Sequence, residues 1–555
     1  MTAAEPTTQV PRWTWVALAV LAAGTFAVAL YAGRGTSPFF DEWTFLITRR
    51  GSDLGTWLDP HNGHLSLVPV LLHKALFSLG GLDGYWLPRA VTALLHIGVG
   101  LAVFRFAAVR LGGPAALIPT ALILGLGLGS EDFLWPFQIG FLCSILFGLL
   151  ALTALASPRR RSGVVALLAL LLSVASSGIG VVFLGAAIVW SALDRQPKKI
   201  AAVAIPAVLY AIWFAAYGAG DGQSKASNLA DVPDYMVKMA AAGFGGLAGL
   251  GPEVGLVLLV TAVGGVAFAL SRPQRVSPLL AALLVAPLAL WALTALSRAH
   301  LGEPGAQRYV YPSAVLIVLL GLELLRRTQP SSRTLVVLGA LTAFFLAAGA
   351  GDLRNEGRAL RGNAEMLRAQ IAAFGLLKDP QVPADFLPAA QVAPQLHASD
   401  LSGITGAYGP LVDDPRGELA GATEAAQLGA DATLLRAEAV RTNAVDETPA
   451  VDTAGAPALY TPAAGDVPSK AGCASAQVGT GQSEVAVPAG AQVVVTTRDP
   501  ASLAFRRFAD GYGPDGQRPL PAQPVVIAPA ADRIPDSTPW RVQVTGGGEL
   551  KVCAL

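Results

Sequence analysis

The chain has 555 residues, of which 53% are hydrophobic and 14% are charged, and its formal net charge is +1. A mean hydropathy of +0.52 and repeated apolar runs near membrane-spanning length exclude an ordinary soluble protein. We therefore expect a multi-spanning α-helical membrane protein, with about eleven transmembrane helices in residues 1–350. Residues 351–555 are soluble in character and predict an α+β region.

The first apolar run, Trp13 to Ala32, is longer than the core of a cleaved signal peptide and predicts a retained helix. An external segment, 33–83, follows it. This segment contains Phe39-Phe40-Asp41-Glu42-Trp43 and then Asp59-Pro60-His61-Asn62-Gly63-His64. The apolar run Leu65 to Leu79 is too short for a comfortable crossing, so we expect a helix lying in the membrane interface.

The apolar runs beyond residue 84 predict ten further crossings. They lie at 85–109, 114–129, 138–156, twice within 163–193, at 200–217, 254–270 and 278–296, in a run ending at Arg326, and at 335–350. The run 163–193 begins and ends beside basic loops, so the positive-inside rule requires an even number of crossings, with a turn at Ser176-Ser177-Gly178. Every basic cluster then falls on the cytoplasmic side, including Arg272 and Arg275. The N-terminus is expected in the cytoplasm and the C-terminal part outside.

The C-terminal part is expected in two sections. Residues 351–470 form a helical and linker region that opens with an amphipathic helix, Asn355 to Leu377. Short β-prone runs between Pro and Gly turns predict a small extracytoplasmic β-sandwich in residues 471–555. Cys473 and Cys553 both lie in this polar part, so these two are the plausible partners of a disulfide outside the cytoplasm.

The unusual polar residues of the first 350 positions collect on the external side of this topology, in the loops 33–83, 130–137 and 298–309. They are Asp41, Glu42, His61, His64, Glu131, Asp132, Arg298, His300, Arg308 and Tyr309. Carboxylates at a membrane surface can act as a general base toward a hydroxyl or coordinate a divalent cation, and arginines can hold a lipid-linked phosphate. The plainer alternative is that loops of membrane proteins are simply polar.

These residue types suit glycosyl transfer from a polyprenyl-phosphate sugar. The base takes a proton from the acceptor hydroxyl, which attacks the anomeric carbon, while Arg or a metal stabilises the departing phosphate. His61 and His64 leave three alternatives open: they share a metal if Asn62-Gly63 forms a turn, contact phosphate or sugar, or make structural hydrogen bonds. Arg308-Tyr309 is also the kind of pair that anchors a helix end at the interface.

The order of several short motifs resembles the GT-C superfamily of membrane glycosyltransferases. They are Phe40-Asp41-Glu42, His61-Asn62-Gly63-His64-Leu65-Ser66, the interfacial helix, Trp86-Leu87-Pro88-Arg89 and Arg308-Tyr309-Val310-Tyr311-Pro312. The pattern looks most like the branch related to protein O-mannosyltransferases and the lipid A aminoarabinose transferase. Two departures exist: His61-Asn62-Gly63-His64 lacks the two prolines of that branch, and Pro88-Arg89 inverts its usual order.

The resemblance implies that Asp41 is the catalytic base and that Glu42, Glu131 and Asp132 assist it. His61, His64, Arg298, Arg308 and Tyr309 are the candidates for binding the donor phosphate or sugar. The implied protein resides in the cytoplasmic membrane, takes a polyprenyl-phosphate sugar and modifies a glycan, lipid or protein acceptor. The placement of the C-terminal part is similar to that in actinobacterial cell-wall arabinosyl- and mannosyltransferases.

Two other functions compete with this one. A transporter or flippase for a lipid-linked saccharide would need polar residues in the middle of helices, where the sequence offers few. A non-catalytic cell-envelope protein built on the β-sandwich would make Asp41 and Glu42 dispensable. Membrane lipids are expected partners in each case, and nothing in the sequence indicates nucleic acid.

Overall fold

The computed structural model describes residues 10–219, 225–271, 277–326, 328, 330–378, 380–533 and 538–555, so the predicted basic turn at Arg272 and Arg275 lies outside the described residues. The chain forms two compact units. One comprises Met1–Gly35 with Thr48–Leu360, and the other comprises Thr36–Ile47 with Arg361–Leu555. We call them the membrane unit and the C-terminal unit.

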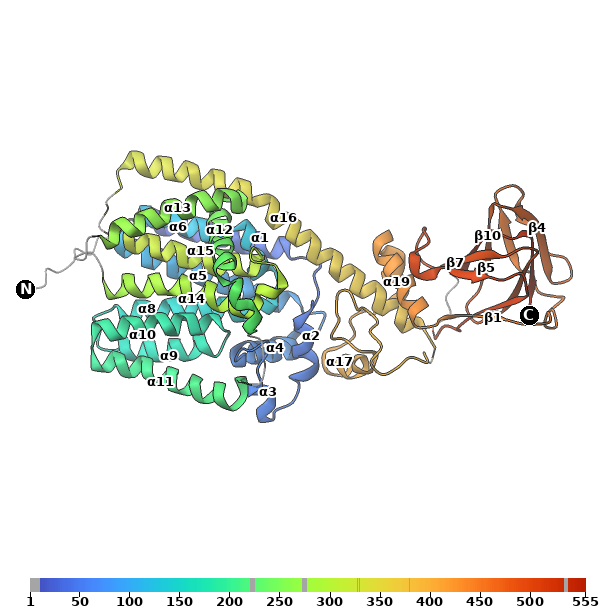
Figure 1. Ribbon diagram of the computed structural model, residues 1–555, viewed down its shortest axis with the longest axis horizontal. Coiled ribbons are helices and arrows are strands. Elements are labelled where there is room, and N and C mark those ends of the chain that lie inside the picture. The colour runs from blue at the N-terminus through green and yellow to red at the C-terminus, as the bar shows by residue number, and fades with distance from the viewer. Residues whose placement is uncertain are drawn as a thin grey trace, which may run out of the picture. The chain divides into compact units, whose positions relative to one another are not determined.

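The membrane unit is a bundle of helices (Figure 1). They are α1 (Arg12–Ala32), α3 (Leu54–Leu58), α4 (Leu67–Gly80), α5 (Trp86–Leu111), α6 (Gly113–Leu124), α7 (Glu131–Leu134), α8 (Ile139–Leu155), α9 (Ser162–Val174), α10 (Ile179–Asp194), α11 (Pro197–Trp213), α12 (Val232–Ala248), α13 (Gly251–Leu270), α14 (Pro278–Arg298), α15 (Gln307–Leu324) and the first part of α16 (Ser332–Leu376). Seven helices in the described ranges are long and apolar enough to cross a membrane.

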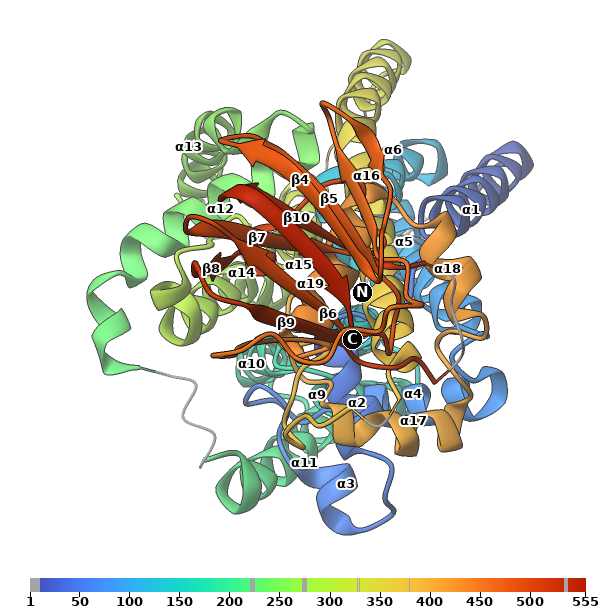
Figure 2. The same ribbon diagram turned by 90° about the vertical axis from the view of Figure 1, so that its right-hand side faces the viewer.

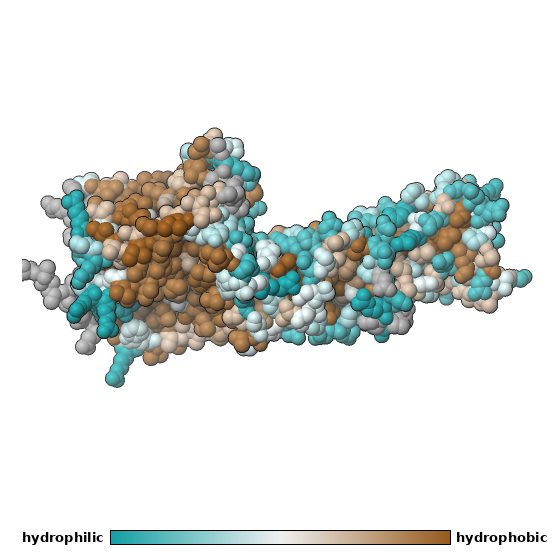
Figure 3. Space-filling model, turned by 90° about the horizontal axis from the view of Figure 1, so that it is seen from below, coloured by the Kyte–Doolittle hydropathy of each residue, from teal (hydrophilic) through white to brown (hydrophobic). Residues whose placement is uncertain are grey.

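The flank of the bundle seen in Figure 3 is mainly hydrophobic, as expected of a surface that faces lipid. A helix occupies each of the eleven predicted crossings. The predicted class, a multi-spanning α-helical membrane protein, is therefore confirmed. The run 163–193 is two short helices, α9 and α10, as expected from the basic loops at both of its ends.

The two ends of the bundle differ in character. At one end, Glu323 of α15 pairs with Arg110 of α5 at 2.9 Å and accepts a hydrogen bond from the Ser277 hydroxyl at 3.0 Å. At the other end, the turn between α9 and α10 lies against the start of α4, where the Val68 amide donates to the Ala175 carbonyl at 2.9 Å. The basic end of α5 and the external segment thus lie at separate ends of the helices, as the charge pattern predicts.

Two boundaries differ from the expectations, the end of the helix that starts near residue 114 and the boundary at residue 350. The helix expected to end at Gly129 ends at Leu124, where glycines start a short 3-10 helix, η1 (Gly127–Gly129). Gly127 permits close packing there, because a Cβ atom at this position would lie 1.9 Å from the Gly349 carbonyl oxygen of α16. The run 235–250 lies mostly in the packed helix α12, in which Tyr235, Met239 and several small residues are buried.

The expected boundary at residue 350 falls inside a helix. α16 continues without interruption from Ser332 to Leu376, over 45 residues, and joins the last predicted crossing to the predicted amphipathic helix. No proline lies within it, and isolated glycines such as Gly349 lower helix stability by only about 1 kcal/mol each.

The C-terminal unit contains the helices α17 (Leu401–Tyr408), α18 (Pro415–Gly421) and α19 (Glu424–Arg436) and eleven described strands. The strands are β1 (Val440–Ala444), β2 (Ala458–Thr461), β3 (Gly465–Val467), β4 (Cys473–Gly479), β5 (Gln482–Val487), β6 (Val493–Thr497), β7 (Ala501–Arg506), β8 (Arg518–Leu520), β9 (Val525–Pro529), β10 (Trp540–Gly546) and β11 (Gly548–Ala554). They form two antiparallel sheets, β1-β9-β6-β11-β4 and β3-β2-β5-β10-β7-β8 (Figure 2).

The core of the C-terminal unit lies between these sheets and continues under α19. In β10, Trp540, Val542 and Val544 alternate toward this core, as a half-buried strand requires. The sheets begin at Val440, before the expected boundary at residue 471. The sequence VRTNA of β1 is too polar to be recognised as a strand, so the prediction started the sheets too late. Cys473 of β4 and Cys553 of β11 are cross-strand neighbours and form the expected disulfide.

Candidate active site

Two of the predicted external loops meet in the membrane unit through Arg308 and Glu131. Arg308 lies in the first turn of α15, where backbone N–H groups have no partner within the helix. One Glu131 oxygen accepts the Arg308 N–H at 3.2 Å, and the other lies 3.5 Å from guanidinium Nη1. The second guanidinium nitrogen, Nη2, donates to Glu303 at 3.1 Å. The guanidinium group is therefore held on two sides by carboxylates.

Gln307 fixes the loop that carries Glu131. Its side-chain oxygen accepts hydrogen bonds from the Ser130 hydroxyl at 3.2 Å and from the Glu131 N–H at 3.3 Å. Its side-chain nitrogen donates to Glu356 of α16 at 2.9 Å. The amide thus ties α7, α15 and α16 together. Neither Gln307 nor Glu356 was a predicted site residue.

The carboxyl groups of Glu131 and Asp132 lie in low-dielectric surroundings. Burial raises the pKa of Glu131, and the nearby Arg308 guanidinium opposes the rise. Asp132 is fully buried, and neither of its carboxyl oxygens has a hydrogen-bond partner in the part of the chain that the structure describes. Burial, and then the Glu131 charge, raise the pKa of Asp132 well above its ordinary value. Burial therefore disfavours the charged form of Asp132 relative to an exposed carboxyl group.

Two tyrosines accompany this cluster. The guanidinium carbon of Arg308 lies 5.1 Å from the centre of the Tyr309 ring, a cation–π distance. Tyr235 of α12 lies within electrostatic range of Arg298, Glu303, Arg308 and Tyr309. Its buried hydroxyl has no hydrogen-bond partner among the described residues. Tyr235 was not among the predicted site residues.

His61 and His64 flank a two-residue turn. Asn62 and Gly63 have φ angles of 52° and 79°, and the backbones of the two histidines exchange two hydrogen bonds of 3.0 Å. Asn-Gly is the sequence that most favours such a turn, because both positions need a positive φ. The turn that metal sharing would require is therefore present.

The two histidine rings pack against different neighbours. The His61 ring centre lies 5.4 Å from that of Phe137, which brings this segment against the loop 130–137. The His64 ring covers Gly178, where an added Cβ would approach the imidazole to 2.6 Å. Asn62 Nδ2 lies 3.1 Å from His61 Nε2. An amide nitrogen only donates, so this ring nitrogen is the acceptor.

The described residues contain no ready-made site for the predicted divalent cation. Nowhere in the described ranges do three His, Cys, Asp or Glu side chains gather closely enough to hold a metal ion. Glu131 is engaged by Arg308, and burial favours the neutral form of Asp132. We derive no step through a metal.

Asp41 and Glu42 belong to the C-terminal unit and begin the helix α2 (Asp41–Thr48). Glu42 is completely buried and accepts the Phe39 N–H at 3.1 Å, and the Trp43 indole donates to the Pro38 carbonyl at 3.1 Å. These contacts fix the turn before α2, in which Phe40 has a φ of 46°. The side chain of Asp41 is only partly buried, so it is the more accessible carboxylate of the pair.

Three other cations in or next to the external segment have backbone partners. Arg89, from the predicted Pro88-Arg89 motif, donates to the Gly33 carbonyl at the end of α1. Arg49 donates to the carbonyls of Gly55 at 2.7 Å and Asp59 at 3.1 Å. Lys74 of α4 donates to the Arg49 carbonyl at 2.9 Å. These cations hold the backbone of the segment in place, so we do not assign them to substrate.

The chain matches no protein-family model and no curated protein. It is similar to the solved structure of ArnT from Cupriavidus metallidurans in the apo state, with 14% identity over 68% of this chain and 83% of that chain and a TM-score of 0.45. It is also similar to the Archaeoglobus fulgidus oligosaccharyltransferase in complex with Zn and sulfate, with 13% identity over 81% of this chain and 73% of that chain and a TM-score of 0.36.

Both solved proteins are GT-C superfamily members, the superfamily that the sequence motifs resemble. Because both TM-scores lie below 0.5, neither likeness by itself says what this chain does.

Proposed function

We propose that the chain is an inverting glycosyltransferase of the GT-C type, which moves a sugar from a polyprenyl-phosphate donor to a hydroxyl acceptor on the outer face of the cytoplasmic membrane. The observation that carries the proposal is the position of Arg308. Its side chain is 30% exposed, belongs to a loop end of an apolar bundle and is held in place by Glu131. A donor with a lipid tail and a phosphate headgroup presents matching chemistry: the tail in the bilayer and the anion at the guanidinium.

Glu303 has a separate role in this proposal. Its side chain is 61% exposed, so its contact with Arg308 Nη2 lies at the surface and is easily exchanged. The donor phosphate replaces Glu303 at Nη2, while the better buried Glu131 continues to orient the guanidinium. The phosphate then gains charge as the sugar leaves, and the guanidinium stabilises it.

Asp41 is the base. Its carboxylate takes the proton of the acceptor hydroxyl, and the oxygen attacks the anomeric carbon on the face opposite the phosphate. A new carbon–oxygen bond forms, the bond to the phosphate oxygen breaks, and polyprenyl phosphate departs with the electron pair. One displacement inverts the anomeric configuration. Glu42 supports this step by holding the turn that presents Asp41.

The orientation follows from the charge pattern of the loops. The N-terminus is cytoplasmic, and the loops 33–83, 130–137 and 298–309 lie outside together with the C-terminal unit. The acceptor is a glycan, lipid or protein of the cell envelope.

The test is transfer by the purified full-length chain in liposomes, supplied with a panel of polyprenyl-phosphate sugars and an extract of cell-envelope acceptors. We expect one donor to be cleaved, with release of polyprenyl phosphate and a product of inverted anomeric configuration. Nucleotide sugars should not serve as donors. Movement of an uncleaved lipid-linked saccharide across the bilayer would instead identify a flippase and overturn the proposal.

A further inference from the structure

The segment that carries Asp41 packs against a turn far along the chain, at residues 389–396 of the C-terminal unit. The Phe40 N–H donates to the Val392 carbonyl at 3.4 Å. The side-chain nitrogen of Gln395 donates to Asp41 Oδ1 at 3.5 Å, across 354 positions of sequence. The other end of the Gln395 amide is buried and has no hydrogen-bond partner within the described part of the chain. Of the two polar atoms of this amide, the nitrogen is therefore the one that lies next to the Asp41 carboxylate.

We propose that Gln395 is a positioning residue for the catalytic base, so that the C-terminal unit is part of the machinery for transfer. This inference rests on the proposed function, in which Asp41 takes the proton of the acceptor. An amide N–H directed at one carboxylate oxygen helps to set the orientation of the carboxyl group. A distance of 3.5 Å is long, but catalytic hydrogen bonds are often long without substrate and tighten in the complex.

The turn that carries Gln395 is itself held firmly. The Ala393 N–H donates to the Ala389 carbonyl at 2.8 Å. From α19, the Thr433 hydroxyl donates to the Pro388 carbonyl at 2.8 Å, and the Arg436 guanidinium donates to the same oxygen at 3.1 Å. Two side chains of one helix therefore fix the start of the turn.

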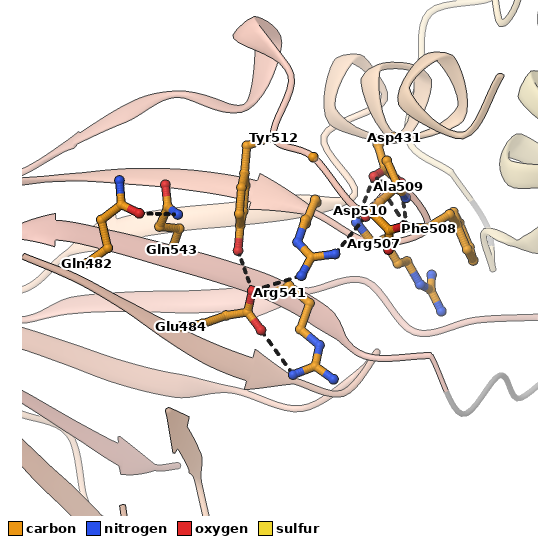
Figure 4. A network of polar contacts seen from close by, with 12 residues as sticks. Asp431, Gln482, Glu484, Arg507, Phe508, Ala509, Asp510, Tyr512, Arg541 and Gln543 are labelled. Carbon is orange, nitrogen blue, oxygen red and sulfur yellow. Dashed lines mark hydrogen bonds and ion pairs between the residues drawn. The ribbon is translucent and has the colours of Figure 1, made fainter. Parts of the chain in front are cut away.

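The helix α19 is in turn fixed to the β-sandwich through Asp431 (Figure 4). The buried carboxylate of Asp431 accepts three backbone N–H groups that follow β7, from Arg507 at 2.8 Å, Phe508 at 3.0 Å and Ala509 at 3.2 Å. Burial raises the pKa of Asp431, and the three backbone donors partly offset that rise. A continuous set of hydrogen bonds thus leads from the sandwich through α19 and the turn to Asp41.

The test compares Gln395→Ala and Gln395→Glu with Gln391→Ala, an exposed position of the same turn. A positioning role predicts that Gln395→Ala lowers kcat about tenfold with little change in the KM of the donor, because a hydrogen bond to a charged group is lost. Gln395→Glu has nearly the same shape but places a second carboxylate beside the base, so kcat should fall further. Gln391→Ala should transfer at the wild-type rate.

A second measurement tests the contact without relying on activity. Phe40→Cys combined with Val392→Cys should form a disulfide when the full-length chain is oxidised, because the backbones touch there. Phe40→Cys with Ser399→Cys is the control pair and should remain reduced.

The outcomes are distinct. A wild-type chain that cleaves no donor would overturn the proposed function and this inference together. Wild-type transfer with normal kcat in both Gln395 variants, or failure of the 40–392 pair to cross-link, would overturn the inference alone.

Discussion

Glu131 binds Arg308 twice, through the backbone N–H at 3.2 Å and through the guanidinium at 3.5 Å. One carboxylate therefore stabilises the first turn of α15 and sets the direction of the cation that the helix carries. These residues are 177 positions apart in sequence, and each occupies a different external loop. The pair places the candidate phosphate site on the rigid end of the bundle.

Replacing Arg308 with Lys tests whether transfer needs the planar guanidinium group or only its positive charge. Arg308→Lys keeps one positive charge but loses the planar fork of donors, so we expect kcat to fall by about 10²-fold. Arg298→Lys, in the same loop, is the matched control and should lose less than about threefold. Steady-state transfer with a defined donor measures both. A larger loss for Arg298→Lys would assign the phosphate to Arg298 instead.

Glu303→Gln should strengthen donor binding. The change removes a carboxylate that occupies Nη2 of Arg308, so the donor phosphate no longer has to displace a charge. We expect the KM for the donor to fall by about threefold at unchanged kcat. A change of this size corresponds to the interaction free energy of a typical surface ion pair. Glu131→Gln should raise the same KM, because the guanidinium loses its orienting partner. An unchanged or raised KM in Glu303→Gln would show that phosphate does not bind there.

The buried carboxyl group of Asp132 should make the thermal stability of the folded chain depend on pH. Burial raises its pKa in the folded chain above the ordinary value of 3.8. A raised folded-state pKa contributes stability that is fully present below pH 3.8 and is lost as pH rises through the folded-state pKa. Asp132→Asn, which stays neutral, should therefore melt above the wild type at pH 8, and the difference should shrink toward pH 4.

The control for this pH series is Asp59→Asn, because the side chain of Asp59 is 57% exposed. It should keep the wild-type dependence on pH. If the difference in melting temperature between Asp132→Asn and the wild type were the same at pH 8 and at pH 4, the buried carboxyl group would not be the cause.

The helices at the eleven expected crossings were predictable because apolar runs of this kind depend on local sequence. Apolar length located the crossings, and basic loops on both sides of residues 163–193 required the turn at Ser176 to Gly178. Asn62-Gly63 likewise specifies its own turn through its backbone preferences. In each case, neighbours in sequence determine the outcome.

The contacts of the site were not predictable in the same way. The charge pattern predicts that Arg298 and Arg308 lie on one side of the membrane, but only tertiary packing brings Arg308 to Glu131. Gln307 and Glu356 join two helices through a single hydrogen bond, and nothing in their local sequence indicates it. The grouping of residues 36–47 with the C-terminal unit also depends on long-range packing, since Gln395 lies 354 positions from Asp41.

The disulfide should stabilise the C-terminal unit. Cys473 and Cys553 close a loop of 80 positions, and loss of such a cross-link typically costs about 2–5 kcal/mol. In the full-length chain, Cys473→Ser with Cys553→Ser should speed amide exchange in β4 and β11. Cys143→Ala, at the buried free cysteine, should leave that exchange unchanged. Equal exchange in all three chains would show that the sheets are stable without the cross-link.

The central claim is that Asp41 takes the proton of the acceptor while a lipid-linked sugar is transferred. The most direct measurement is single-turnover transfer from a radiolabelled polyprenyl-phosphate sugar by the wild type, Asp41→Asn and the control Asp59→Asn, with folding checked by thermal melting. The account predicts that Asp41→Asn loses at least about 10³-fold in rate, while Asp59→Asn and both melting temperatures stay near wild type. Wild-type transfer by Asp41→Asn would contradict it.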